Sequence, residues 1–137
     1  MSALESVLFA LSVAIPLVAL VAGKTPERIS ALIFALNTIA TGVCGYFLGF
    51  RDIGILLLTF DGVMALSFLA LAVIYNYLWI ALMMGAMAGY FAIHAYYLAM
   101  NLPLDEMFAI SSNIATSVVL ISLAIGVWGS RRRPAET

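Results

Sequence analysis

Residues 62–104, GVMALSFLALAVIYNYLWIALMMGAMAGYFAIHAYYLAMNLPL, run for 43 residues without a Lys, Arg, Asp or Glu. With the apolar residues that precede Asp61, the stretch Ile53–Leu104 covers 52 residues, which as one helix would be about 78 Å long. A helix needs only about 20 residues to cross the roughly 30 Å hydrocarbon core of a bilayer. The stretch must therefore fold back once. Tyr75-Asn76-Tyr77 is the predicted turn, because Asn favours turns and aromatic rings favour the membrane interface.

The rest of the chain divides at its charged residues in the same way. Residues 6–23, 29–50 and 107–130 are further apolar stretches, each long enough for one spanning helix. Residues that commonly begin or end helices agree with this division, and in chain order these residues are Gly23, Thr25-Pro26-Glu27, Asp52, Asn101 with Pro103, and Asp105-Glu106. Among them, Thr25 is the predicted N-cap of the second helix. We predict one all-α domain over 1–137, a bundle of five transmembrane helices at about 4–22, 27–49, 53–74, 78–100 and 105–128.

The composition agrees with a protein whose surface faces lipid. Hydrophobic residues make up 65% of the 137-residue chain and charged residues 9%, whereas soluble domains carry about 25% charged residues. A net charge of −1 supplies no basic field for nucleic acid. The single cysteine, Cys44, forms no intramolecular disulfide and is expected to be a packing residue. Enzyme motifs such as GxSxG, HExxH and Walker sequences are missing from the chain, so we expect no enzyme.

The distribution of Lys and Arg predicts the orientation. Five spans put Lys24, Arg28 and Arg131–Arg133 on one side and only Arg51 on the other. Because cytoplasmic loops carry an excess of Lys and Arg, we expect an outside N-terminus and a short basic cytoplasmic tail, 129–137. The expected location is the inner (cytoplasmic) membrane of a bacterium.

Asp61 is the most unusual residue, since it lies about nine residues, or roughly 13 Å, inside the third predicted helix. An ionised Asp near the bilayer centre costs about 2.5–3.5 kcal/mol on insertion scales, so it is normally paired or protonated. Asp61 lies 15 residues before Asn76 and His94 lies 18 after it. In antiparallel helices this leaves an offset of about 4–5 Å, and we predict an Asp61–His94 contact as the polar centre of the protein.

Polar residues on other helices extend this predicted centre. Tyr90 and Tyr97 lie one turn to either side of His94 and are expected to donate to it or to a ligand. Asn37 and Asn113 complete the predicted set. Three roles remain open for the Asp61–His94 pair: a structural link between two helices, a proton or ion relay, and a ligand or cofactor site. A single histidine also permits axial ligation of haem or chlorophyll, although no cofactor is predicted.

Two further groups of residues are predicted from their type and position. The first group is small and is expected to pack against neighbouring helices: Gly42, Gly45, Gly49, Gly85 and Gly89. The second lies near helix ends and is expected to anchor the bundle at the lipid interface: Trp79, Trp128, Arg131, Arg132 and Arg133.

Several short motifs resemble a group of small uncharacterised polytopic membrane proteins of alphaproteobacteria, of the sphingomonad type. The motifs are Gly23-Lys24-Thr25-Pro26-Glu27-Arg28, Asp61, Tyr77-Leu78-Trp79, His94 fifteen residues after Trp79, and Gly126-Val127-Trp128 before Arg131–Arg133. This sequence has Ile80 and Met87 where that group tends to have Pro and Gln. The resemblance implies the same topology and the Asp/His pairing, and it brings no function.

The sequence leaves three functions open. Small size and smooth Gly/Ala faces favour a non-enzymatic bundle that acts as a homo-oligomer or as an accessory subunit of a larger membrane complex. The first alternative is a small proton-coupled transporter or channel that uses Asp61 and His94. The second is pigment or haem binding through His94.

Overall fold

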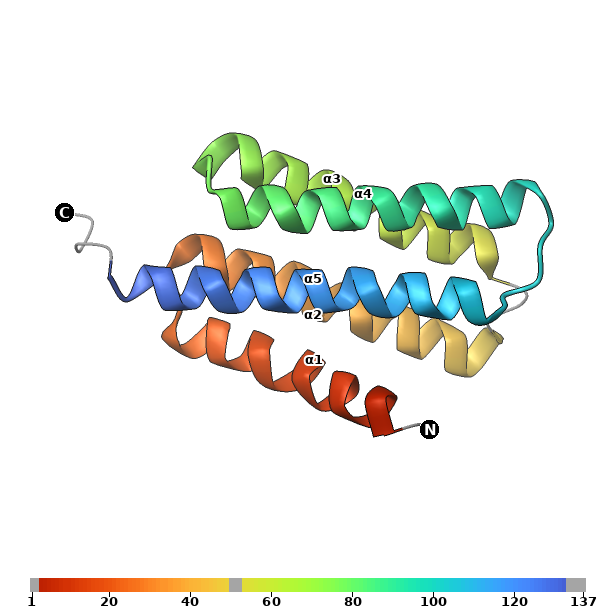
Figure 1. The fold of residues 1–137 in the computed structure, drawn as a ribbon, viewed down its shortest axis with the longest axis horizontal. Helices are drawn as coiled ribbons and strands as arrows, with labels where there is room; N and C mark the ends of the chain where they lie inside the picture. The colour runs from red at the N-terminus through yellow and green to blue at the C-terminus, as the bar shows by residue number, and fades with distance from the viewer. Residues whose placement is uncertain (1–2, 50–52, 133–137) are drawn as a thin grey trace.

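The computed structural model describes residues 3–49 and 53–132, and side chains from Ser6 onward. Within these residues the chain forms five α-helices: α1 Ala3–Ala22, α2 Thr25–Leu48, α3 Gly54–Tyr75, α4 Leu78–Ala99 and α5 Glu106–Ser130. Successive helices run in opposite directions (Figure 1). The all-helical prediction is confirmed, and its boundaries are within two residues of the observed ones.

Four of these helices, α2 to α5, are long and apolar enough to cross a membrane, and residues 6–22 of α1 form a shorter apolar helix. The core lies between α2, α3, α4 and α5, with α1 packed on α2 and α5. Its side chains are mainly Phe34, Met64, Phe68, Met83, Leu120 and Leu123. Large apolar side chains are also exposed along every helix, which is the surface that lipid solvates.

The turn between α1 and α2 places charged residues at one end of the bundle. Lys24, not Thr25, is the N-cap of α2, so the predicted cap was wrong by one residue. The buried Glu27 accepts a hydrogen bond from the Lys24 backbone N–H at 2.9 Å, which satisfies a donor that the helix leaves unpaired. A methyl group at Gly23 would lie 2.4 Å from the Ala19 carbonyl oxygen; only glycine fits there.

The two other described connections follow the sequence signals. Asn76 adopts the left-handed conformation (φ 50°, ψ 40°) and ends α3, as Asn tolerates better than most residues. Asn101, also at φ 50°, ends α4. The Asp105 carboxylate then accepts a 3.0 Å hydrogen bond from the Phe108 N–H and caps α5. Arg51 and the predicted Asp52 cap lie outside the described residues.

The packing prediction for the glycines was largely wrong within this chain. A methyl group at Gly42, Gly85 or Gly89 would meet nothing within 4 Å. Gly45 is buried, whereas Gly49 is an exposed C-cap at φ 79°. Close approaches between helices occur at other glycines, where an added methyl group would lie 3.1 Å from Leu98 at Gly54, 3.0 Å from the Phe91 ring at Gly62 and 2.8 Å from the Trp79 ring at Gly126.

The residues predicted to lie at the lipid interface differ in their exposure. Trp128 is 67% exposed and its ring lies 5.8 Å from the Arg132 guanidinium carbon, which suits an interfacial anchor. Arg131 is exposed as well, and Arg133 lies outside the described residues. Trp79 is only 8% exposed and belongs to the core. It was wrongly assigned to the interface, because its ring occupies the space left open by Gly126.

Candidate functional site

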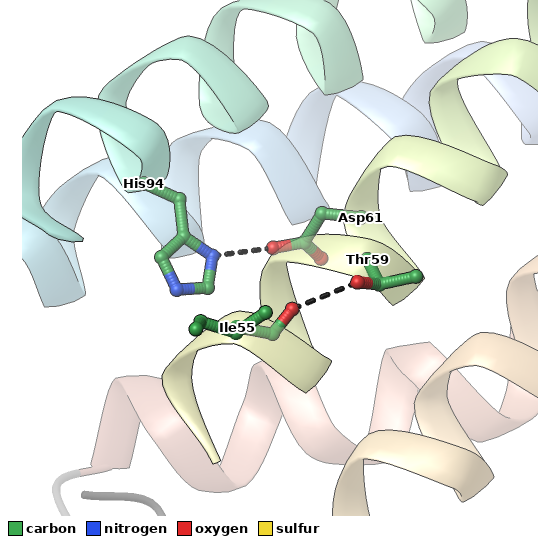
Figure 2. A network of polar contacts seen from close by, with 4 residues as sticks. All are labelled: Ile55, Thr59, Asp61 and His94. Atoms are coloured by element: carbon green, nitrogen blue, oxygen red, sulfur yellow. Dashed lines mark hydrogen bonds and ion pairs between the residues drawn. The ribbon is translucent and has the colours of Figure 1, made fainter. Parts of the chain in front are cut away.

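A histidine and an aspartate meet inside the bundle. His94 Nδ1 on α4 lies 2.7 Å from Asp61 Oδ2 on α3 (Figure 2), and the two side chains are only 5% and 11% exposed. The predicted contact is present. The neighbouring Thr59 hydroxyl instead donates to the Ile55 carbonyl oxygen of its own helix at 2.8 Å (Figure 2).

The local sequence explains why the two helices are close here. Gly62 follows Asp61 directly, and the space beside it is taken by the Phe91 ring of α4. His94 is three residues from Phe91 and therefore lies on nearly the same face of α4. The glycine thus lets α4 approach α3 at the level of the aspartate.

The second polar atom of each side chain remains available. Among the described residues, no protein group is hydrogen-bonded to Asp61 Oδ1 or His94 Nε2, and neither atom is sealed from solvent. When Asp61 is ionised it accepts the Nδ1–H of the imidazole, so Nε2 presents either a lone pair or a second N–H. The pair therefore offers one oxygen and one nitrogen to a ligand or a proton.

Both residues line a cavity of about 840 Å³ between α2, α3, α4 and α5. Asp61 and His94 contribute to its wall, and Asn101, Leu102 and Pro103 form its rim. These rim residues are exposed and belong to the α4–α5 connection, which lies at the opposite end of the bundle from the C-terminal end of α5 (Figure 1). The cavity accordingly opens at that end and leads inward to the Asp–His pair.

The structure brings together some of the predicted site residues and separates others. Tyr90 and Tyr97 line the cavity beside His94. The Tyr97 hydroxyl donates to Asp105 Oδ1 at 2.8 Å and not to His94, which was one of the two partners predicted for it. Asn37 and Asn113 are half-buried and do not belong to the cavity lining; on their helices that position is taken by Thr41 and Ser112.

Phe108 is a lining residue that the sequence analysis missed. Its ring centre lies 5.2 Å from that of His94, 5.7 Å from Tyr90 and 5.3 Å from Tyr97. The four rings form a continuous aromatic wall, which we call the ring wall: Tyr90, His94, Tyr97 and Phe108. One signal was available: Phe108 is four residues before Ser112 and seven before the buried Ala115, so all three share a helix face.

Asp105 carries a negative charge close to this wall. The Phe108 backbone N–H, and next the Tyr97 hydroxyl, lower the pKa of the Asp105 carboxyl. Because its folded-state pKa is depressed, Asp105 stabilises the fold above its unfolded-state pKa, and that contribution is lost as the pH falls through the folded-state pKa.

Replacing Tyr97 by Phe tests this contact. We expect the pKa of Asp105 to rise, because one of its hydrogen-bond donors is removed, while the Phe108 N–H keeps it below the ordinary value. Carbon-13 NMR of labelled Asp carboxyl groups across a pH titration measures the change. An unchanged Asp105 titration in Tyr97→Phe would show that the hydroxyl contributes nothing.

The described residues offer few ligands for a metal. No three His, Cys, Asp or Glu side chains among them come together as a metal site requires. The atom available for axial ligation of haem or chlorophyll is His94 Nε2, and Asp61 would orient that imidazole as a carboxylate commonly orients a ligating histidine. An absorption spectrum of the purified protein tests this possibility directly.

Comparisons with protein-family models, curated proteins and solved structures find no match to this chain.

Proposed function

We propose that this protein spans the inner membrane of a bacterium with five helices, α1 included. The α1–α2 turn and the C-terminal end of α5 lie at the same end of the bundle (Figure 1). They bring Lys24, Arg28, Arg131 and Arg132 to that end. By the excess of Lys and Arg, this end faces the cytoplasm, and the cavity opens to the outside.

We propose further that the chain is a small proton-coupled transporter whose central site is the Asp61–His94 pair. The observation that carries this proposal is the position of the pair, buried between α3 and α4 and facing a cavity that reaches the end of the bundle. Ionisable side chains within membrane helices are costly and commonly mark proton or ion pathways. No reaction is proposed, since the site offers no nucleophile activated by a base.

The charge of the pair supplies a physical basis for coupling. With Asp61 ionised and His94 neutral, the pair carries one negative charge inside a low-dielectric bundle. Taking up one proton makes the pair neutral overall, and so does binding one external cation. The site therefore favours being occupied by a single positive charge, whether a proton or a cation.

A purely structural role accounts less well for this arrangement. α3 and α4 already pack along their length, helped by the contact of Phe91 with Gly62. A buried ion pair is weak evidence for stability, because its desolvation offsets its attraction. A structural link also gains nothing from leaving Asp61 Oδ1 and His94 Nε2 open to a cavity.

The inner end of the cavity is closed by apolar side chains. One turn further along each helix, Met64 follows Asp61 on α3 and Met87 precedes Tyr90 on α4, and both are buried. Beyond them lie Phe68 and Met83, which are fully buried. Transport by alternating access requires this apolar layer to open toward the cytoplasm while the rim closes.

Proton flux through reconstituted protein tests the proposal. Vesicles of neutral lipid that contain the protein and an enclosed pH-sensitive dye are given an inward proton gradient. We expect the gradient to dissipate faster than in protein-free vesicles, once a potassium ionophore removes the opposing membrane potential. A rate equal to that of protein-free vesicles, with candidate solutes absent, added outside or enclosed within the vesicles, would refute the proposal.

A second candidate function is an oligomer or an accessory subunit of a larger membrane complex. It is favoured by an exposed groove of about 450 Å³ between α4 and α5, lined by Gly85, Gly89, Ala81, Ala86 and Ala115 among others. Small residues at this spacing allow a second helix to approach closely. The two candidates are compatible, because five helices are few for a transporter and a dimer would double them.

Gly89→Leu tests the groove, because a Cβ atom added at Gly89 would meet none of the described residues within 4 Å. If α4 of a second copy occupies the groove, we expect the variant to shift from dimer to monomer in detergent. Light scattering measures the molar mass of the protein in the detergent complex and so distinguishes dimer from monomer. Gly129→Leu, at another open glycine, is the control. Wild-type protein that is already monomeric, with no co-purifying subunit, would contradict this candidate.

A further inference from the structure

The composition of the cavity wall points to a class of ligand. We propose that the cavity binds small organic cations with apolar substituents, such as quaternary ammonium or phosphonium ions, in exchange for a proton. This proposal rests on the transport function proposed above. The proposal depends on three properties of the described wall: its charge, its rings and its leucine side chains.

The charge of the wall favours a cation over an anion. Asp61 is the acidic residue of the described lining, and that lining contains no Lys or Arg. The ionised Asp105 lies next to the rim through its hydrogen bond to Tyr97. An anion in this cavity would face the Asp61 carboxylate with no Lys or Arg in the lining to compensate, whereas a cation would be drawn toward Asp61.

The ring wall favours an organic cation over a small metal ion. Three of its four rings, Tyr90, Tyr97 and Phe108, stay uncharged at neutral pH and line the same side of the cavity. Aromatic faces attract cations that carry few hydration waters, with energies that increase when water is excluded. Metal ions prefer several oxygen or nitrogen ligands, and no such cluster exists in the described part of the chain.

The remaining lining is mainly apolar, with Thr41, Asn101 and Ser112 as its polar members, and the cavity is large enough for a sizeable ligand. Four leucines belong to it: Leu57 is buried, whereas Leu98, Leu102 and Leu104 are partly exposed. A cavity of about 840 Å³ falls within the range that holds drug-sized molecules. The ligand's apolar groups would contact these leucines and its charge would lie near Asp61.

The proton and the organic cation are expected to exchange, because each of them neutralises the same negative charge on the Asp61–His94 pair. When the imidazole is protonated, the pair is neutral and its Nε2–H points to the cavity. Arrival of an organic cation next to Asp61 then favours release of that proton from Nε2 to cavity water, which leaves His94 neutral. The other titratable groups near the pair are Tyr90 and Tyr97 on α4 and Asp105 before α5; α2 contributes the uncharged Thr41.

Binding of tetraphenylphosphonium to the full-length protein in phosphatidylcholine nanodiscs tests the proposal, with empty nanodiscs as the blank. Tetraphenylborate is the matched control, since it has the same shape and the opposite charge. We expect saturable binding of the phosphonium alone, because only a cation is attracted to the Asp61 carboxylate. Equal binding of both ions, or no saturable binding of the phosphonium, would overturn the proposal.

Single substitutions measure separately what the Asp61 charge and the aromatic rings contribute to phosphonium binding. Asp61→Asn is expected to abolish saturable phosphonium binding. Tyr90→Leu is expected to weaken it roughly 5- to 30-fold, while Tyr90→Phe keeps it because the ring remains. Thr59→Ala, on the exposed side of α3, is the control. Phosphonium binding that survives Asp61→Asn or is unaffected by Tyr90→Leu would overturn the proposal. Proton flux that depends on Asp61 without any phosphonium binding would refute this ligand class alone and leave the transport function standing.

Discussion

Asp61→Asn is expected to fold and insert normally and to lose proton flux to the level of protein-free vesicles, a decrease of roughly tenfold or more. Asn has nearly the same shape as Asp, so its side-chain oxygen still accepts the Nδ1–H of His94 at the 2.7 Å position. It cannot carry the negative charge. The pair then alternates between neutral and positive, and an unpaired positive charge in the bundle is strongly disfavoured. The proton is therefore no longer taken up.

Stability measurements on related variants distinguish a working site from a structural link. His94→Ala leaves the Asp61 carboxylate buried and without its partner, and breaking a buried pair in this way costs about 3–5 kcal/mol. Replacing both residues by Leu removes the pair without leaving a charge, and such replacements are often neutral or stabilising. We expect the double variant to be as stable as wild type and inactive in proton flux.

Thermal unfolding in detergent, followed by tryptophan fluorescence, gives the stabilities, and the enclosed pH-sensitive dye gives the flux. Because Trp79 is buried and Trp128 exposed, the buried ring reports on the core. A structural link requires the opposite pattern, in which the double variant is destabilised by kilocalories. Flux that persists in the double variant would show that the proton takes a path independent of Asp61 and His94.

The sequence was sufficient for the helices and for the central contact, because both depend on position along the chain. Charges and cap residues mark where a helix leaves the apolar core, so Asn76 and Asp105 predicted boundaries correctly. Asp61 and His94 could be matched by counting residues outward from one turn, since antiparallel helices rise by a constant amount per residue.

The sequence was not sufficient to tell which side of a helix faces inward. In a soluble helix the apolar stripe identifies the buried side, but lipid is as apolar as a leucine core, and the pattern loses that information. Gly85 and Gly89 were therefore assigned to packing and are exposed, while Trp79 was assigned to the interface and is buried. Asn113 and Ser112 are adjacent, and only Ser112 belongs to the cavity lining.

Alanine substitutions at two glycines test which glycines pack against a neighbouring helix. Gly126→Ala is expected to have the larger effect on stability. Its new methyl group would lie 2.8 Å from two atoms of the Trp79 ring, which is closer than carbon atoms approach without repulsion. Trp79 is itself enclosed, with the Tyr77 ring stacked on it at a centroid distance of 6.3 Å. The ring cannot move without disturbing the core, and overpacking of this kind costs about 1–3 kcal/mol.

Gly89→Ala is the matched control on α4, since its methyl group would meet nothing within 4 Å. We expect the free energy of unfolding to stay unchanged or to rise by up to about 1 kcal/mol, because Ala favours the helix over Gly. Both variants are compared by detergent unfolding, with Trp79 fluorescence expected to shift only in Gly126→Ala. If Gly89→Ala were the more damaging variant in a monomeric preparation, α4 would present its Gly85-x-x-x-Gly89 face to the core, and the arrangement of α4 against α5 described above would be wrong.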